Sequence, residues 1–446
     1  EIEPGNGWDY TGWVGALARD PSMDGAFLGK AICDTYLAGC EAYGTADAAT
    51  LSVVDMRGLP KLREAYEAFG TAALRQAEKN PQTFFAAFSR AAGSAVNYGG
   101  NTREQGYANM VDLGSLSQHA HRLLPSVADA LQQAVQESVV YKVSGPYRRE
   151  SSGLSGYYSY NGDVDHFMAY AEQAAPLLPV KCLYYGLIFG KMPPQAAPYL
   201  QGAAVGEATP ITQPEERKKI FDVSQLEDTP VDIDKDGNAF VKLSAAQMEN
   251  LASVHCQLVF QSKEDDVLLY LGSDADINAD WETGVFKDNF QGNWPMLDGH
   301  PVYIEITYEG DGYNLYSVPI KLNGKDGNLQ VVYTFDDQAY HILGVRRGIE
   351  ANGMADKELT PLKAGDVVTT LHYAMKLSGH EEEFQQFEVD TFTLGAQPQI
   401  ADEAMGDGVY GYCFEFVDPQ NKSALSRVVT YTIKNGKIVT SVETNN

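Results

Sequence analysis

A proline-rich stretch at residues 192–218 separates two parts of the chain that have different hydrophobic patterns. This stretch contains five prolines and shows no apolar periodicity. Because proline ends helices and is excluded from central strands, such a stretch is typical of a connection between domains. The sequence therefore predicts a linker at 192–218, with the boundary near residue 215, between a domain at 1–191 and a domain at 219–446.

The first part has the spacing of amphipathic helices. In residues 59–79, Leu62, Tyr66, Phe69 and Ala73 form one apolar stripe. A second helix is expected to begin after Asn80, with Pro81 at its first position, and to stop at Gly93. A third helical stretch covers 113–136, with an interruption near Pro125. These helices predict a packed helical layer.

Short β-branched segments interrupt this helical pattern. Residues 49–56 (ATLSVVDM) and 137–145 (ESVVYKVSG) have the composition of strands buried beneath helices. Residues 152–162 (SGLSGYYSYNG) predict a further aromatic strand that ends in an Asn-Gly turn. Strands that alternate with helices indicate an α/β layer arrangement.

The second part has the alternation and turn residues of β-structure. Segments such as PVYIEITYEG, LQVVYTF and VYGYCFEFVD are separated by glycine and aspartate turns. Asn435 and Gly436 fit a two-residue hairpin turn. We expect an all-β domain, with a sandwich as its arrangement.

Length and charge exclude some partner classes. A chain of 446 residues is long enough for two or three domains, each with its own core. Its net charge is −27, and most of this charge falls after residue 200. Such acidity argues against nucleic acid and anionic membranes as partners. No apolar run approaches the roughly 20 residues that span a bilayer, so no membrane span is expected.

No complete catalytic apparatus is visible from residue spacing. The five cysteines include no CxxC pair, and we interpret them as buried thiols. His119 and His121 lie two apart in an expected helix, so they point to different faces and do not form a metal pair. Asp163, Asp165 and His166 are interpreted as the start of a helix rather than as acid–base residues.

Two acidic loops have the spacing of calcium ligands. Asp232, Asp234, Asp236 and Gly237 open such a loop, but the closing position is Leu243 where a glutamate is needed. The same residues suit an Asp-Gly turn. The loop SDADINADWETG, with Asp274, Asp276, Asn278, Asp280 and Glu282, leaves the same two alternatives open. The expected cofactor is therefore none, with calcium as the alternative.

The first seventy residues carry a family resemblance. EPGNGWDYTGWVGAL, GKAICDTYL and ATLSVVDMRGLPKLREAYEAF resemble the clostripain-like cysteine peptidases, relatives of the caspases, just after their catalytic cysteine strand. SSGLSGYYSYNG resembles a later family segment, from which Gly156 and Tyr157 depart. The β-rich part is similar to the C-terminal extension of many gut-bacterial members.

The resemblance implies a fold, an activity and a partner. The implied fold is an α/β caspase-like portion with a helical layer, followed by an all-β, sandwich-like domain. The implied activity is a secreted or cell-surface hydrolase, a cysteine endopeptidase that cleaves protein and peptide substrates after Arg or Lys. The family's histidine and cysteine strands both lie upstream of residue 1, so no catalytic residue is assigned here. The chain alone is expected to be inactive and to require an N-terminal peptidase fragment.

The opening loop supplies the expected substrate-binding residues. By resemblance, Trp8 and Tyr10 wall the substrate pocket, and Glu3 or Asp9 meets a basic side chain. The alternative is that these aromatic residues anchor the first helix. A second hypothesis for the whole chain is a catalytically inactive, peptidase-derived module whose β domain binds protein or glycan.

Overall fold

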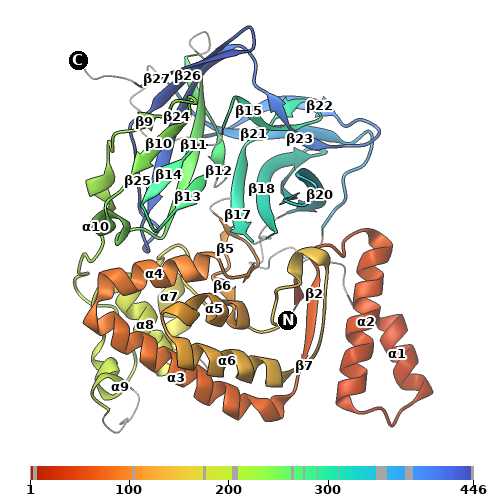
Figure 1. The fold of residues 1–446 in the computed structure, drawn as a ribbon. Helices are drawn as coiled ribbons and strands as arrows, with labels where there is room; N and C mark the ends of the chain where they lie inside the picture. The colour runs from red at the N-terminus through yellow and green to blue at the C-terminus, as the bar shows by residue number, and fades with distance from the viewer. Residues whose placement is uncertain are drawn as a thin grey trace.

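The computed structural model describes residues 2–3, 8–102, 106–173, 177–202, 209–262, 266–274, 277–288, 290–310, 312–347, 359–376 and 385–442. Helices gather in the first half of the chain and strands in the second half, as the hydrophobic patterns predict. Figure 1 shows the helical half below the β-rich half, with α1 and α2 at one side. The mixed α and β composition is thus confirmed.

A small sheet lies between helices in the first half. It has the order β1-β2-β7 and consists of β1 (Ile2–Glu3), β2 (Thr50–Val54) and β7 (Val139–Ser144). Both pairings are antiparallel. Figure 1 shows β2 and β7 between α2 (Gly25–Tyr43) and the pair α3 and α6. The two strands predicted beneath helices are therefore present.

The helical layer follows the predicted boundaries closely. Pro81 begins α4, and Gly93 ends it. The stretch predicted at 113–136 is interrupted before Pro125, which begins α6. The helices of this half, besides α2, are α1 (Tyr10–Arg19), α3 (Leu59–Lys79), α4 (Pro81–Gly93), α5 (Leu113–His119), α6 (Pro125–Ser138), α7 (Val164–Glu172), α8 (Leu178–Phe189) and α9 (Ala197–Gln201).

An aromatic core holds these helices together. Phe84 and Phe88 stack with their ring centroids 5.6 Å apart, and Phe88 also contacts Tyr158 at 6.1 Å. Helix α8 is buried along almost its whole length, so it forms the centre of this half. Burial of these large side chains supplies most of the apolar stabilisation of the layer.

The strand predicted at 152–162 is shorter in the structure. Only β8 (Ser155–Tyr157) is a strand, and it joins β6 (Met110–Asp112) and β3 (Asn97–Tyr98) in a separate sheet of order β3-β6-β8. The next aromatic residues leave the strand because they pack against helices: Tyr158 is buried in the helical core. A two-stranded ribbon, β4 (Asn101–Thr102) and β5 (Gly106–Tyr107), lies beside them.

The expected linker packs against the helical half. Gly190 ends α8 with φ +71°, and a Cβ there would lie 1.8 Å from the carbonyl oxygen of Lys218. Only glycine allows this approach. The Lys218 amide donates to the Phe189 carbonyl oxygen at 2.9 Å. Residues 194–196 and Ala197–Gln201 form helical turns, which the sequence pattern does not predict in a proline-rich stretch. Proline is tolerated in the first turn of a helix, so its presence does not exclude such short turns.

The second half is built on one large sheet. Its main path has the order β20-β19-β18-β17-β12-β11-β24-β26-β27, and β21 pairs with both β12 and β18. Consequently β17 and β21 both lie between β12 and β18. Each pairs with a different segment of these two strands. The strands of this sheet are β11 (Ser253–Ser262), β12 (Val267–Asp274), β17 (Ile304–Glu309), β18 (Tyr313–Leu322), β19 (Lys325–Thr334), β20 (Ala339–Arg346), β21 (Val367–Lys376), β22 (Gln385–Thr393), β24 (Gly408–Val417), β25 (Ser423–Leu425), β26 (Val429–Lys434) and β27 (Lys437–Val442).

Two smaller sheets pack on this large sheet. One has the order β13-β14-β10-β9 and the other β16-β15-β23. A shared core that includes Phe286, Trp294 and Phe414 joins all three sheets. Their strands are β9 (Asp232–Ile233), β10 (Ala239–Lys242), β13 (Asn278–Asp280), β14 (Val285–Lys287), β15 (Asn293–Leu297), β16 (His300–Pro301) and β23 (Ile400–Ala404), with a short helix α10 (Ala245–Met248) after β10. The prediction that the second half is rich in β-strands is confirmed.

The predicted hairpin is also present. Asn435 and Gly436 connect β26 to β27 with φ values of 49° and 69°. Two successive positive φ angles are the requirement of a type I′ turn, which Asn-Gly satisfies with little strain.

Polar contacts join the two halves at several points. The Gln82 side chain donates from Nε2 to Oδ1 of Asn250 at 2.7 Å. The Tyr313 hydroxyl donates to the carbonyl oxygen of Tyr147 at 2.9 Å. A mixed apolar cluster with residues from both halves surrounds this second contact. The halves therefore share an interface rather than a flexible tether.

Candidate functional site

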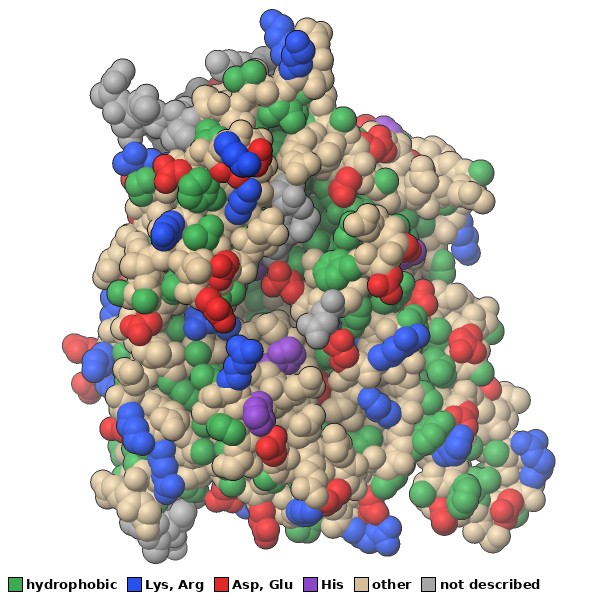
Figure 2. Space-filling model, in the orientation of Figure 1, with side chains coloured by type: hydrophobic (Ala, Val, Ile, Leu, Met, Phe, Trp, Pro, Cys, Tyr) green, Lys and Arg blue, Asp and Glu red, His purple; other side chains and the backbone are tan. Residues whose placement is uncertain are grey.

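A cavity of about 1040 Å³ lies between the two halves. Figure 2 shows the surface hollowed between the helical and β-rich halves. Its helical wall comes from α4, α5 and the segment that follows β8, and its strand wall comes from β11, β13 and β17. Ligand sites occur preferentially at such domain interfaces. The cavity is therefore the candidate functional site, which we call the interdomain cavity.

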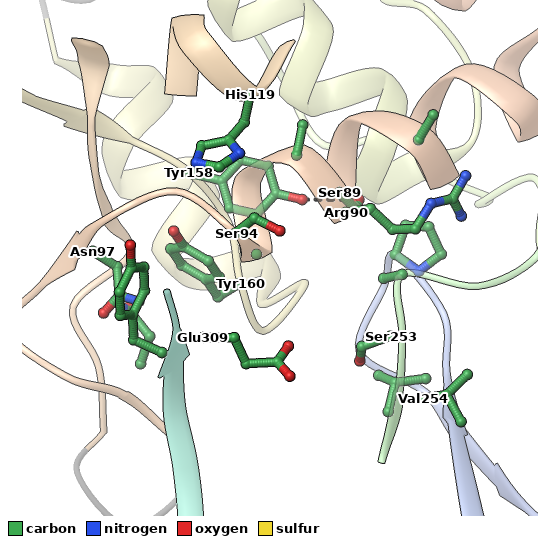
Figure 3. Close-up of a pocket in the computed structure, with 18 of the residues that line it drawn as sticks. Ser89, Arg90, Ser94, Asn97, His119, Tyr158, Tyr160, Ser253, Val254 and Glu309 are labelled. Carbon is green, nitrogen blue, oxygen red and sulfur yellow. Dashed lines mark hydrogen bonds between the residues drawn. The ribbon is translucent and has the colours of Figure 1, made fainter. Parts of the chain in front are cut away.

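Two tyrosines form the back of the helical wall. The Tyr158 hydroxyl donates to Oγ of Ser89 at 2.8 Å, and the Tyr160 hydroxyl donates to the Ala92 carbonyl oxygen at 3.2 Å. Figure 3 shows both rings on the helical side of the pocket. Burial raises the pKa of both phenols well above the usual value. These tyrosines are neutral and present their rings to the cavity.

Arg90 connects the helical wall to the strand wall. Its Nη1 donates to the carbonyl oxygen of Leu251 at 2.5 Å, and its guanidinium lies 4.9 Å from the ring centroid of Trp281. Burial lowers the pKa of Arg90 from its ordinary value. Arginine remains charged in proteins, so this side chain places a cation against an aromatic face at the interface.

The strand wall carries a serine–histidine pair. Ser253 and His255 are two residues apart on β11, so both side chains point to the same face of the sheet. Ser253 Oγ lies 2.7 Å from His255 Nε2, within hydrogen-bond distance. The remaining ring nitrogen, Nδ1, is buried, and no residue in the described part of the chain forms a hydrogen bond with it. Both residues line the cavity, and Figure 3 shows Ser253 on the side opposite Tyr160.

Burial and a neighbouring carboxylate act in opposite directions on His255. Burial lowers the pKa of this imidazole, and the charge of Glu415 raises it. Glu415 is the direct partner of His255 in the register of β11 and β24. Because burial has the larger effect, the imidazole is held in its neutral, basic form.

The residues predicted for substrate binding lie away from this cavity. Asp9 caps α1 by accepting from the amides of Thr11 and Gly12, both at 3.1 Å. Tyr10 has 64% of its surface exposed, and Trp8 has 38% exposed. Glu3 pairs with Thr50 in the β1–β2 ladder. Trp8, Asp9 and Tyr10 are not among the residues that line the interdomain cavity. The loop and the cavity are thus separate regions.

The cysteines are buried, as expected. All five are free and buried: Cys33, Cys40, Cys182, Cys256 and Cys413. Burial is the main cause that raises the pKa of Cys33 to about 11, and that of Cys182 and Cys413 to about 12. A raised pKa suppresses the thiolate, which is the nucleophilic form.

The first acidic loop forms a turn. The Asp234 carboxylate accepts from the amides of Asp236 and Asn238 at 2.9 and 3.0 Å, and forms an ion pair with Lys287. Gly237 has φ +88°, as the Asp-Gly turn requires. Leu243, at the position of the closing ligand, is buried in the core.

The second acidic loop is described only in part. Asp280 accepts from the amides of Glu282 and Thr283. Asp276 and the side chain of Asp274 lie outside the described residues. Within the described ranges, no group of three His, Cys, Asp or Glu side chains is placed to hold a metal ion.

The remaining sequence candidates have local roles. His121 pairs with Asp129 at 3.2 Å, whereas His119 lies at the end of α5 and lines the cavity. Asp163 caps α7 by accepting from the amide of His166 at 2.8 Å, which agrees with the interpretation of this segment as a helix start.

Ser253 and His255 are not among the site residues predicted from the sequence. They are the first and third residues of β11. A serine and a histidine two apart at strand spacing are the local signal for this pair. The position of Glu415 beside it depends on the register of two strands that are distant in the sequence.

No protein-family model matches this chain, and comparison with curated proteins finds no match. Among the helices in the described ranges, none is both long and apolar enough to cross a membrane.

Proposed function

We propose that this chain is the C-terminal portion of a secreted, clostripain-like cysteine endopeptidase that cleaves after Arg or Lys. The catalytic histidine and cysteine come from an N-terminal portion that docks against it. The observation that carries this proposal is the edge of β2. Within the described residues, β7 pairs with all of β2 on one side, and β1 pairs with Thr50 and Leu51 on the other.

In this proposal the upstream strand continues β1 along β2. Strand β1 is antiparallel to β2, with Ile2 opposite Leu51 and Glu3 opposite Thr50. A strand that continues β1 in the upstream direction would therefore lie beside Val53 and add main-chain hydrogen bonds to that edge. The family's cysteine strand is the occupant that the resemblance predicts for this edge.

The helices around β2 are compatible with that arrangement. Helix α2 packs on one face of the sheet through Cys33, Tyr36 and Cys40, against Leu51. The α3 and α6 layer covers the other face (Figure 1). A strand added beside Val53 would extend a sheet that already has helices on both faces, which is the layer arrangement of α/β peptidase folds.

The burial of the thiols in this chain supports a nucleophile that comes from another segment. A cysteine nucleophile needs an accessible thiolate beside a base. The five cysteines are buried, and the pKa of Cys33, Cys182 and Cys413 is raised. None of them meets that requirement, so the proposal assigns the attacking thiolate to the N-terminal portion.

The α1 loop is the proposed substrate contact. Trp8 and Tyr10 have exposed surface that a peptide can cover, and the carboxylate of Asp9 lies beside them at the helix N-terminus. In this proposal the aromatic rings wall the pocket and the acid attracts the basic side chain. Glu3 joins them through its place in β1, next to the same sheet edge.

Reconstitution with the upstream segment tests the proposal. We expect no cleavage of an Arg-containing fluorogenic peptide by this chain alone, and cleavage when the segment encoded upstream is added. Thiol alkylation of the upstream segment should abolish the activity. Cleavage by this chain alone, or activity that resists alkylation, would contradict the proposal.

A charge-neutralising variant tests the loop separately. Asp9→Asn keeps an N-cap acceptor and removes the charge, so it should raise KM for Arg substrates roughly tenfold with little change in kcat. Asp24→Asn is the matched control, because Asp24 caps α2 by accepting from the Phe27 amide at 2.9 Å. An equal effect of both variants would reject a substrate role for Asp9.

A further inference from the structure

The serine–histidine pair in the interdomain cavity has the geometry of a nucleophile and its base. Ser253 Oγ and His255 Nε2 are 2.7 Å apart. In nucleophilic catalysis, a base within this distance takes the hydroxyl proton as the oxygen attacks. Because both residues lie on one face of one strand, the backbone of β11 fixes their spacing.

A carboxylate lies beside the pair. Glu415 is directly opposite His255 on β24, and partners in an antiparallel register have Cβ atoms about 5 Å apart. Its charge raises the pKa of the imidazole. Nδ1 of His255 is buried, and the described residues provide no hydrogen-bond partner for it. Glu415 therefore acts on the base through its charge and not through a hydrogen bond to Nδ1.

The volume and the lining of the interdomain cavity indicate the substrate class. The cavity of about 1040 Å³ leaves room for a small substrate beside Ser253. Its lining combines hydroxyl, amide and aromatic groups, such as Asn97, Tyr160 and Thr307, with short aliphatic side chains, such as Val254, Ile277 and Ile306. A short acyl group on a polar alcohol fits such a lining.

We propose that Ser253, His255 and Glu415 form a hydrolytic site for short-chain carboxylic esters. The Ser253 oxygen attacks the ester carbonyl carbon while its proton passes to His255 Nε2. The carbonyl–alkoxy bond then breaks, and the proton moves from Nε2 to the departing alkoxy oxygen, which leaves as an alcohol. Water attacks the acyl-serine by the same route, which releases the carboxylic acid and restores the serine.

The three residues have different roles in this site. Ser253 is the nucleophile and His255 the general base and acid, so both are catalytic residues. Glu415 is a positioning residue, because it acts through the imidazole. The site does not depend on the proposed peptidase function: it uses a hydroxyl of this chain, whereas that function uses a thiol of another segment.

Labelling with a fluorophosphonate tests the nucleophile. The probe forms an oxygen–phosphorus bond with an activated serine and releases fluoride. We expect one label per chain, located at Ser253 by peptide mass spectrometry, on the full chain in its native state. Ser253→Ala should remove the label. Ser22→Ala is the control, since Ser22 is exposed and does not line the cavity, and it should label as the wild type does.

Two further variants test the base and the positioning residue. His255→Gln should slow labelling roughly 100-fold, the usual contribution of a general base. Glu415→Gln removes a charge that raises the pKa of His255, so the midpoint of the labelling rate should move to lower pH. Other ionisable groups that line the cavity with this pair include Glu305 and Glu309 on the strand wall and Arg90 and His119 on the helical wall.

Turnover of p-nitrophenyl acetate completes the test. We expect hydrolysis by the wild-type chain that Ser253→Ala abolishes and that iodoacetamide leaves unchanged. Equal labelling of wild type and Ser253→Ala, an unchanged pH profile in Glu415→Gln, or ester hydrolysis that does not require Ser253 would each overturn the proposal. Thiol sensitivity separates this activity from that of the peptidase.

Discussion

Asp112 in the helical half and His255 in the strand half both have buried polar atoms, but these atoms differ in their hydrogen bonds. In the helical half, the fully buried carboxylate of Asp112 accepts from the Tyr98 hydroxyl at 2.6 Å and from the amides of Ser115 and Ser152 at 2.8 and 2.7 Å. In the strand half, His255 has a buried ring nitrogen with no hydrogen-bond partner in the described part of the chain. A satisfied buried group stabilises a fold, whereas an unsatisfied one needs a separate explanation, which for His255 is the proposed role as a base.

Two buried acids of the β-rich half are satisfied, as Asp112 is. Asp288, buried at the centre of that half, accepts from the Phe290 amide at 2.5 Å and from the Tyr431 hydroxyl. Asp418, which lines the cavity, accepts from the amides of Gln420 and Lys422 at 2.8 and 3.0 Å. The strand scaffold therefore provides donors for these acids but none for Nδ1 of His255 among the described residues.

The largest expected effect comes from Asp112. Asp112→Ala leaves two amides and one hydroxyl without their acceptor, which should lower the free energy of unfolding by about 3 kcal/mol or more. His255→Gln, which removes no such network, should change it by less than about 1 kcal/mol. Urea unfolding monitored by circular dichroism measures both. Similar losses in the two variants would remove the distinction between a structural and a functional buried group.

The next effect concerns the connection between the halves. Arg90→Met removes the hydrogen bond to the Leu251 carbonyl oxygen and the cation over Trp281. We expect a loss of about 1–3 kcal/mol and faster amide exchange near Leu251. Arg57→Met is the control, because Arg57 is exposed and pairs only locally with Asp55. If exchange near Leu251 stays unchanged in Arg90→Met, Arg90 does not couple the halves.

The smallest effect is a pH dependence with opposite signs at two acids. Burial is the main cause that raises the pKa of Asp288 above its ordinary value of 3.8. The folded state then binds more protons than the unfolded state, so this contribution to stability is greatest below pH 3.8 and falls as pH rises through the raised value. Asp288→Asn should flatten that decline in unfolding curves measured from pH 3 to 7.

Asp234 provides the matched comparison. The ion pair with Lys287 and backbone amides lower the pKa of Asp234 below 3.8. Its contribution is therefore present above pH 3.8 and lost as pH falls through the lowered value. Asp234→Asn should lose stability at neutral pH and not in acid. A pH dependence of the same sign at both acids would contradict the assigned difference in environment.

Local rules account for the parts of the fold that the sequence predicts. Proline at the first helical position places the start of α4 at Pro81, and the Asn435–Gly436 pair meets the dihedral requirement of its hairpin. Helix α3 covers the predicted residues 59–79, because its apolar stripe has helical period. In each case the deciding interactions lie within a few residues of one another.

Long-range pairings account for what the sequence does not predict. The interdomain cavity requires α4 to meet β11, through contacts such as that of Arg90 with Leu251. The neighbour of His255 is Glu415 because β11 and β24 pair in one particular register. A shift of one residue in that register would turn the glutamate to the other face. Such registers are set by the packing of the whole sheet, which hydrophobic alternation alone leaves open.

The burial of all five thiols makes the chain its own reporter of unfolding. A maleimide reagent meets no accessible cysteine of this chain in the native state, so the rate at which it modifies each thiol measures the opening of the surrounding region. Cys40 reports on the α2 layer, Cys182 on the helical core and Cys256 on the large sheet. The order in which these three cysteines are modified would show the order in which the three regions unfold.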